Sequence, residues 1–413
     1  MNSPMNILWI VIDCLRADHC AASNVPGLKA WPRLCESGTC FEQALCTTST
    51  TPTTFASMLT GLYPFSHGVI SPKGPAIGRS VTTVAELFRE QGYATHAFMT
   101  GPLLGVHGHD RGFSSYEHRD RTRHIYSDWG SDLFDRFRQG LEGRPWMTML
   151  HFFELHRPIQ TDGKFSNGKS SQQYVLAWKM LDEQLDRLLN HVPDNTIVVL
   201  TGDHGEELER RSDQSFVQHG IRKIRRKMKM AYRPTDYKHH GYFPFDTLHH
   251  VPLVISGPGI QSGRQCQQQV RHVDIMPTLL DLTRISPPEE IHGRSLMPLL
   301  KGGTMPDESA YLYTGWNDPN RAWHALRADG WKYIEKTPDC PHRNGQAYLF
   351  DLRQDPGETI NLVKKHPETA SRMQRELNLL YSQEFSFSSS GPNEIPAEEQ
   401  KNLENKLSDL GYI

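Results

Sequence analysis

Residues 7–13 read ILWIVID, an apolar run that ends in an aspartate. A continuous apolar run of this length predicts a strand buried on both faces, as in parallel sheets covered by helices. Similar runs follow in YATHAF (93–98), MTMLHFF (147–153), TIVVLT (196–201) and PLVIS (252–256). Helical patterns separate them, for example in residues 81–91 and 171–192. The alternation predicts an α/β fold with a doubly wound, mostly parallel sheet flanked by helices.

The sequence changes character after residue 303. GGTMPDES has the composition of a linker, and the segment after it carries short β-rich runs and a charged helical tail. The runs are YLYTGW (311–316), HALRA (324–328), WKYIE (331–335) and AYLFDL (347–352), and the tail is LENKLSDLGYI (403–413). We therefore expect an α/β domain in residues 1–303. A smaller α+β subdomain, with a small antiparallel sheet and a terminal helix, would occupy residues 304–413.

The bulk composition narrows the functional classes. The 413 residues carry a formal net charge of −2, so no overall field favours a nucleic acid polymer. No apolar stretch approaches the roughly 20 residues of a membrane span, and residues 1–19 lack the form of a signal peptide. The 7 cysteines are an odd number without a paired framework, which suits a reducing compartment. These features predict a cytoplasmic protein, with a homo-oligomer as one option.

Polar residues follow three of the predicted strands. They are Asp13, Glu154, His156, Asp203 and His204. In open α/β sheets ligands bind beyond the carboxyl ends of the strands, so we expect these side chains to converge. Carboxylates combined with imidazole suit a divalent cation. Any one of them alone could instead cap a helix or sit in a polar loop.

A cluster of hydroxyls, CTTSTTPTTFASMLTG, occupies residues 46–61. Phe55, Met58 and Leu59 are spaced i, i+3 and i+4, which predicts a helix that begins just after the threonines. The N-terminus of a helix has free N–H groups and binds anions well. A metal ion beside a hydroxyl there would make it a nucleophile. The alternative is that the threonines only cap the helix.

Several stretches of the chain resemble the sulfatase branch of the alkaline phosphatase superfamily. They include NILWIVIDCLRADH, TTFASMLTGLYPFSHGV, FFELHRP, VVLTGDHGEEL, HHVPLVISGPGI, VRHVDIMPTLLDL and YLFDLRQDPGETINL. The resemblance covers nearly the whole chain and implies the same doubly wound sheet with a small C-terminal antiparallel sheet. It places the metal ligands at Asp13, Asp203 and His204. The nucleophile, also in contact with the metal, falls on Thr51 when counted from Leu-Thr-Gly, or on Thr50 when counted from the proline.

The resemblance also implies roles for four histidines. His156 matches a residue that contacts the anionic group of the substrate, and His67, His240 and His250 match positions that commonly line the same pocket. We expect His156 and His250 to act in catalysis and His67 and His240 to bind substrate. His67 and His250 could alternatively be structural histidines.

One departure from the family pattern concerns the nucleophile. Thr stands where sulfatases have the Cys or Ser that becomes formylglycine, and threonine cannot form that aldehyde. The resemblance therefore predicts hydrolysis of a small anionic phosphate ester, mono- or diester, through a phosphothreonine. The alternatives are a sulfuric ester hydrolase, a phosphoryl transferase and a non-catalytic binding protein.

A second departure concerns the metal. Cys14 stands where many sulfatases have a second aspartate, so the site loses one oxygen ligand. This favours Zn²⁺ or Mn²⁺, with Ca²⁺ or Mg²⁺ as alternatives, and a thiolate there would favour Zn²⁺. Cys14 could also be a small buried residue that binds nothing. A second metal held by Glu154, His156 and His240 stays open.

A basic run, RKIRRKMKM, lies between residues 221 and 230. Such a run can be a solvated surface helix. It can also be a lid that attracts a polyanionic substrate. Both readings stay open at this point.

Overall fold

The structure is a computed structural model of the chain. It describes residues 4–141, 145–161, 164–166, 171–208, 240–315, 322–338, 340, 346–387 and 393–409. The basic run, and with it the proposed lid, lies outside the described residues.

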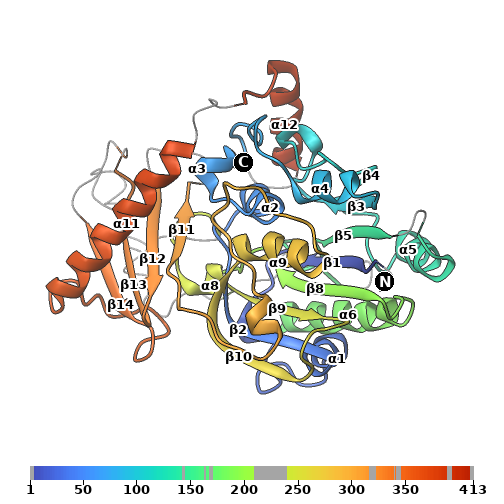
Figure 1. Cartoon of the computed structure of the whole chain (residues 1–413), viewed down its shortest axis with the longest axis horizontal. Helices are drawn as coiled ribbons and strands as arrows, with labels where there is room; N and C mark the ends of the chain where they lie inside the picture. The colour runs from blue at the N-terminus through green and yellow to red at the C-terminus, as the bar shows by residue number, and fades with distance from the viewer. Residues whose placement is uncertain are drawn as a thin grey trace.

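The molecule is built around an eight-stranded sheet with the order β10-β2-β9-β8-β1-β5-β3-β4 (Figure 1). Its strands are β1 (Asn6–Ile12), β2 (Gly38–Leu45), β3 (Ala94–Thr100), β4 (Ser115–Arg119), β5 (Trp146–Phe152), β8 (Thr196–Gly202), β9 (His250–Ser256) and β10 (Arg264–Arg271). Neighbouring strands are parallel except β9, which runs antiparallel to both β2 and β8. The sheet confirms the predicted mostly parallel α/β fold. The prediction omitted β2, β4 and β10.

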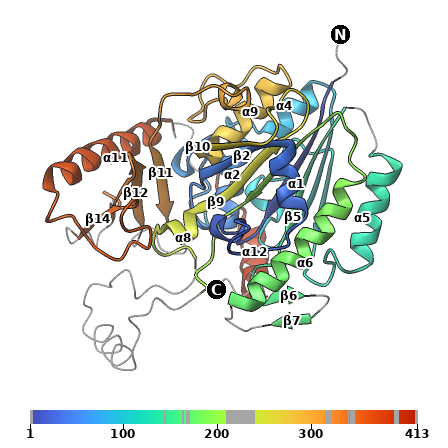
Figure 2. The same cartoon turned by 90° about the horizontal axis from the view of Figure 1, so that it is seen from below.

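Helices cover both faces of this sheet (Figure 2). Strand β1 shows why, because its side chains alternate between two apolar clusters. Ile7, Trp9 and Val11 pack in the cluster of α2, α4 and α9. The intervening residues pack with α1, α5 and α6 on the other face. The helices are α1 (Ala30–Ser37), α2 (Thr51–Thr60), α4 (Val84–Glu90), α5 (Asp128–Gln139), α6 (Ser171–Leu189) and α9 (Ile275–Leu282).

A separate antiparallel sheet follows in the C-terminal part, with the order β11-β12-β13-β14. Its strands are β11 (Ala310–Thr314), β12 (Trp323–Ala328), β13 (Trp331–Lys336) and β14 (Ala347–Asp351), and α11 (Pro367–Phe387) packs against it. The terminal helix α12 (Ala397–Asp409) lies apart from this sheet and packs on Phe153 of the main domain (Figure 1). The fold thus includes the expected small antiparallel sheet, while the boundary at residue 303 stays a prediction.

The remaining elements are short. They are η1 (Ala17–His19), α3 (Pro64–His67), η2 (Gly105–His107), β6 (Ile159–Thr161), β7 (Lys164–Ser166), α8 (Asp246–His249), η4 (His272–Asp274) and α10 (Met297–Leu300). Among the residues that the structure describes, no helix is long and apolar enough to cross a membrane.

Helix α2 begins where the spacing of apolar residues predicts it. Thr50 is the extended N-cap, Thr51 is the first helical residue, and proline follows in the first turn, where its missing N–H has no helical partner in any case. The helix ends at Gly61, whose φ of 68° is left-handed and whose N–H donates to Ser57 O over 2.9 Å. Phe55 and Met58 face the core. These contacts fix the position of Thr51 at the edge of the sheet.

Candidate active site

Two neighbouring strands, β1 and β8, end side by side and bring Asp13 and Asp203 together. Ile12 pairs with Gly202 at the end of the ladder. The backbone pairing continues one step further, because Asp203 N donates to Ile12 O over 3.2 Å and Asp13 N donates to Phe152 O over 2.8 Å. Both carboxylates are fully buried. They lie at the carboxyl edge of the sheet, as expected for a ligand site of an α/β fold.

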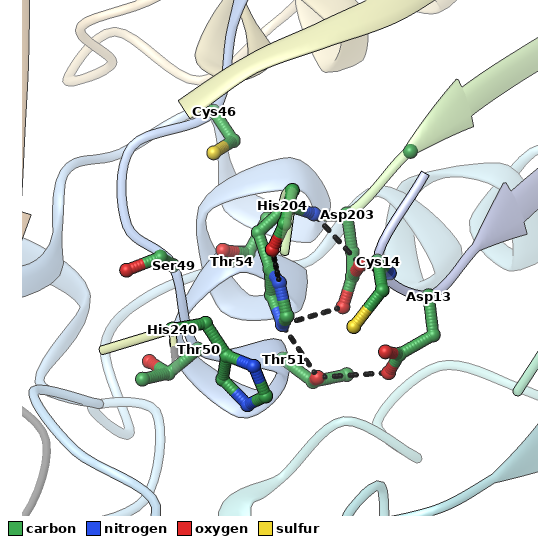
Figure 3. Close-up of polar contacts among 12 residues, drawn as sticks. Asp13, Cys14, Cys46, Ser49, Thr50, Thr51, Thr54, Asp203, His204 and His240 are labelled. Atoms are coloured by element: carbon green, nitrogen blue, oxygen red, sulfur yellow. Dashed lines mark hydrogen bonds and ion pairs between the residues drawn. The ribbon is translucent and has the colours of Figure 1, made fainter. Parts of the chain in front are cut away.

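The hydroxyl of Thr51 lies between Asp13 and His204 (Figure 3). Thr51 Oγ1 donates to Asp13 Oδ2 over 3.1 Å and lies 3.3 Å from His204 Nε2. The hydroxyl of Thr50 instead lies 3.4 Å from Thr48 Oγ1. Of the two threonines, Thr51 is the one whose oxygen reaches the carboxylates. The sequence-predicted residues Asp13, Thr51, Asp203 and His204 therefore do come together.

Asp203 organises the backbone around this centre. Its Oδ1 accepts hydrogen bonds from Cys14 N over 3.0 Å and from His204 N over 2.7 Å. Its Oδ2 lies 3.5 Å from His204 Nε2. One carboxylate oxygen thus fixes two loops, and the other faces the space beside Thr51.

The donor atoms fit a bound cation. Asp13 Oδ1 is buried and has no hydrogen-bond partner among the described residues, which is costly for a carboxylate unless an ion completes it. His204 Nδ1 donates to Gly205 O over 2.9 Å, and His151 Nδ1 lies 3.2 Å from Thr100 O. A carbonyl held at Nδ1 leaves Nε2 as the ligand atom, which is the usual arrangement of metal-binding histidine. The chemistry of the donors therefore suits a divalent metal.

The histidines around Asp13 favour the ionised form of its carboxyl group. Burial alone would raise the pKa of Asp13. The imidazoles of His156, His151 and His204 outweigh that effect and hold the pKa well below its ordinary value. Asp13 is therefore ionised at neutral pH, as a metal ligand must be.

Three groups of buried side chains place their donor atoms within 4.8 Å of one another. The groups are Asp13 with His151 and Asp203, Asp13 with Cys14 and His156, and Cys14 with His204 and His240. His151 is new with respect to the sequence prediction. Its only sequence signal is an imidazole inside an otherwise apolar strand.

His240 lies on the side of Thr51 away from Asp13 (Figure 3). Glu206 holds its ring in place. His240 Nδ1 donates to Glu206 Oε2 over 3.1 Å, and the His240 ring centroid is 4.7 Å from that of His204. Burial would lower the pKa of His240, but the Glu206 carboxylate raises it above its ordinary value. Glu206 was not among the predicted site residues, although it lies in the stretch VVLTGDHGEEL that carries the family resemblance.

His156 lies in the site in a form that fits the metal-ligand alternative better than the expected contact with an anionic group. Its ring stacks on Phe153 with centroids 4.3 Å apart, and Nδ1 donates to Arg157 O over 2.8 Å. Burial, with a further contribution from His240 and Arg121, lowers the pKa of His156 to about 3. A neutral ring with Nδ1 donating presents Nε2 as a lone pair. That arrangement suits a metal ligand rather than a donor to an anion.

Two expected pocket histidines are engaged elsewhere. His67 Nδ1 accepts from Val69 N over 3.1 Å and its Nε2 lies 3.0 Å from Ser57 Oγ, so neither ring nitrogen is left for a substrate. His250 Nε2 lies 2.7 Å from Glu42 O. His250 also lines a separate polar cavity of about 850 Å³ whose wall does not include Thr51. Both residues thus make structural contacts, and their expected roles stay predictions.

Glu154, one of the three residues of the possible second metal site, contacts a buried arginine. Its Oε1 accepts from Arg119 Nη2 over 3.3 Å and from Ile125 N over 3.1 Å. Both charged groups are buried, and no donor group found among the described residues includes Glu154. Glu154 thus forms a buried ion pair with Arg119, and the second metal stays a prediction.

The chain belongs to the sulfatase family. Residues 5–285 match the family model described as Sulfatase. Residues 239–383 match the model described as N-sulphoglucosamine sulphohydrolase, C-terminal. The two matches together span both sheets.

Curated relatives agree with this family. Arylsulfatase K of Gallus gallus is 31% identical over 210 residues, which cover 48% of this chain and 34% of that protein. Delta 4,5-hexuronate-2-O-sulfatase of Bacteroides thetaiotaomicron is 29% identical over 231 residues, which cover 51% of this chain and 40% of that protein. The matched regions therefore span about a third of the length of the arylsulfatase relatives, for example 34% of the one from chicken.

Solved structures share the fold across nearly the whole chain. The phosphonate monoester hydrolase of Agrobacterium radiobacter superposes with a TM-score of 0.69 at 20% identity, covering 92% of this chain and 96% of that one. A 2-O GAG sulfatase superposes with a TM-score of 0.71 at 19% identity, covering 92% of each chain. At these identities the likeness concerns the fold alone.

Proposed function

We propose that the chain is a metal-dependent hydrolase of sulfuric monoesters that uses Thr51 as its nucleophile. The observation that carries the proposal is the position of the Thr51 hydroxyl, 3.1 Å from Asp13 Oδ2 and 3.3 Å from His204 Nε2 at the start of α2. Membership of the sulfatase family supports the ester class. The name of the bacterial hexuronate sulfatase supports a sugar as the alcohol part of the substrate.

The binding residues follow from the donor set. Asp13, Asp203 and His204 would hold the divalent metal, and Thr51 lies beside them. The metal supplies positive charge next to the Thr51 hydroxyl and lowers its pKa. The first-turn N–H groups of α2 have no acceptor within the helix, so they are placed to bind the oxygens of the sulfuryl group.

The proposed reaction has two steps. Thr51 Oγ1 loses its proton to solvent and forms a bond to sulfur while the bond from sulfur to the ester oxygen breaks. His240, oriented by Glu206 through Nδ1, gives the proton at Nε2 to the departing alcohol oxygen. Water then attacks the sulfur and passes a proton to His240, and Thr51 Oγ1 leaves and regains a proton. The products are the alcohol and sulfate.

A second candidate is hydrolysis of phosphate esters at the same site. The specific observation that favours it is the side chain itself, since threonine supplies an oxygen nucleophile without the aldehyde that sulfatases make from Cys or Ser. The same residues would serve both reactions, with phosphorus in place of sulfur. The sequence alone predicts this reaction first, whereas the relatives favour the sulfuric ester.

The test compares Thr51→Ala with Thr50→Ala on nitrophenyl sulfate, nitrophenyl phosphate and bis-nitrophenyl phosphate. Loss of the nucleophile should lower kcat/KM on the order of 10³-fold or more. Thr50→Ala should stay within about threefold, because the Thr50 hydroxyl is hydrogen-bonded to Thr48 and not to the carboxylates of the site. Full activity of Thr51→Ala would exclude Thr51 as the nucleophile. The ratio of rates on the sulfate and the phosphates decides between the two ester classes.

A further inference from the structure

We propose that Cys14 is a thiolate ligand of the metal centre and that, with Asp13 and His156, it makes the site selective for Zn²⁺ over Ca²⁺ and Mg²⁺. This inference extends the proposed function by naming the metal class. It concerns a residue at which many members of the family have an oxygen ligand. Its test reads metal binding rather than activity.

The first argument is the way in which the backbone presents Cys14. Its φ of 62° is left-handed, a conformation that costs a residue with a Cβ on the order of 1 kcal/mol or more. The surrounding structure maintains this turn from both sides. Cys14 N donates to Asp203 Oδ1 over 3.0 Å, and Cys14 O accepts from Tyr174 Oη over 2.7 Å. As Figure 3 shows, the resulting turn directs the sulfur toward the space between Asp13, Thr51 and His204.

The second argument is the number of donor atoms around this sulfur. Cys14 Sγ lies within 4.8 Å of donor atoms of Asp13 and His156 in one group, and of His204 and His240 in another. Ligands of one tetrahedral Zn²⁺, at metal distances of about 2.0 to 2.3 Å, lie about 3.5 Å apart. Only small side-chain movements would close the group of Asp13, Cys14 and His156 around one ion. We assign Cys14 and His156 to the same ion that Asp13, Asp203 and His204 would hold, and leave His240 to Glu206.

The third argument is the hydrogen bonding behind His156. Its Nδ1 donates to Arg157 O over 2.8 Å, and its ring is stacked on Phe153. A backbone carbonyl at Nδ1 fixes the tautomer with the lone pair on Nε2, which is typical of imidazole that binds a metal. The ring is thus held in a ligand geometry by two independent contacts.

The chemistry of the set explains the selectivity. Ca²⁺ takes 6 to 8 oxygen ligands and Mg²⁺ prefers oxygen octahedra, so a buried sulfur is a poor partner for either. A thiolate with imidazole and carboxylate is a common Zn²⁺ environment. Changing the sulfur to oxygen should therefore reverse the preference.

The chain offers a matched control in Cys46. It is fully buried near the same site, but its Sγ lies 3.5 Å from Leu248 O and belongs to none of the donor groups found among the described residues. Figure 3 shows it on the far side of His204 from Asp13. Removing its thiol should leave metal binding unchanged.

The experiment exchanges the bound metal for Co²⁺ and records the near-ultraviolet charge-transfer absorption of a thiolate bound to cobalt. Wild type and Cys46→Ser should show the band, and Cys14→Ser should lack it. Cys14→Ser should also bind Zn²⁺ at least about 10- to 100-fold more weakly in a chelator competition. Cys14→Asp should gain affinity for Mg²⁺ or Ca²⁺ relative to Zn²⁺ and provides a second variant if Cys14→Ser does not fold.

Three results would overturn the inference. They are a wild-type cobalt protein without the thiolate band, an unchanged band in Cys14→Ser, and an unchanged metal preference in Cys14→Asp. Thr51→Ala separates this test from that of the proposed function, because it should lose activity and keep the band. An active Thr51→Ala with the band would contradict the proposed nucleophile while supporting the sulfur ligand.

Discussion

Glu206 shows how one buried carboxylate can shape the chemistry of the residue it contacts. It holds His240 Nδ1 at 3.1 Å, and its own pKa is lowered to about 2, against the effect of burial, mainly by the His240 imidazole. The charge of the pair keeps a proton available at His240. The proposed role of His240 therefore depends on the contact with Glu206.

Glu206→Gln should lower kcat about 10- to 100-fold for esters of alkyl alcohols. Nitrophenyl esters should suffer much less, because nitrophenolate departs without a proton. The measurement is kcat on both kinds of ester for this variant and for Glu207→Gln, the neighbouring carboxylate, as the control. An equal loss on both kinds of ester would argue against proton donation through His240.

From the residue pattern alone, the sequence predicts a metal ligand only where a side chain that can bind a metal follows a recognisable apolar strand. Asp13 and Asp203 follow apolar strands, so their convergence at one sheet edge follows from the fold. His151 lies inside a strand, and only the fold reveals that its ring reaches Asp13, with Nε2 and Oδ2 3.6 Å apart. His67 matched a pocket position, but its two hydrogen bonds depend on Ser57 and Val69, whose placement no spacing indicates.

At the scale of elements, strands with a continuous apolar run were predictable, whereas the strands with interspersed polar residues, β2, β4 and β10, were not. Strand β1 is apolar along its length, whereas β10 reads RQCQQQVR and exposes several of its polar side chains at the edge of the sheet. Strand β9 was predicted from its apolar run, but its antiparallel direction was not. Direction depends on how the chain returns to the sheet, which a local pattern does not contain.

Helix α2 carries Thr51, and its end offers a test of local stability. Gly61→Ala should destabilise the fold by about 1–2 kcal/mol, because a left-handed residue with a Cβ is strained. The new Cβ would also lie 3.3 Å from Met276 Sδ. Urea unfolding measures the loss. Gly92→Ala, with a φ of 81° and no atom within 4 Å of the new Cβ, isolates the backbone contribution and should cost no more than Gly61→Ala. A neutral Gly61→Ala would contradict the strain.

At the scale of the whole molecule, buried histidines set the response to acid. Among the described histidines, burial is the largest cause that lowers the pKa of several below the ordinary value of 6.5, and five examples lie outside the candidate active site. The pKa is lowered to about 3 in His107, His249 and His272, and to about 4 in His109 and His292. The unfolded chain then binds more protons than the folded one between about pH 4 and 6.5. Stability should be full above about pH 6.5 and fall as the pH drops below it.

The measurement is the free energy of unfolding between pH 7.5 and 5.5. His109→Gln removes one titrating group and should therefore flatten the slope by up to one proton, about 1.4 kcal/mol per pH unit. Glutamine is chosen because it can still donate a hydrogen bond to Pro52 O, which lies 2.8 Å from His109 Nε2. The exposed His366→Gln is the control and should leave the slope unchanged. A slope that His109→Gln does not alter would show that His109 titrates normally in the folded protein.

The segment just before Thr51 is joined to the C-terminal sheet. Tyr313 N in β11 donates to Thr47 O over 2.8 Å, and Thr48 forms a bridge with Tyr313. A segment early in the chain thus receives a backbone hydrogen bond from a strand that is synthesised some 260 positions later, at Ala310–Thr314. During synthesis on the ribosome, the first sheet can assemble once β10 has emerged, before the segment ahead of Thr51 has this support. The order in which the polypeptide emerges therefore delays a fully formed candidate active site until most of the protein has been made.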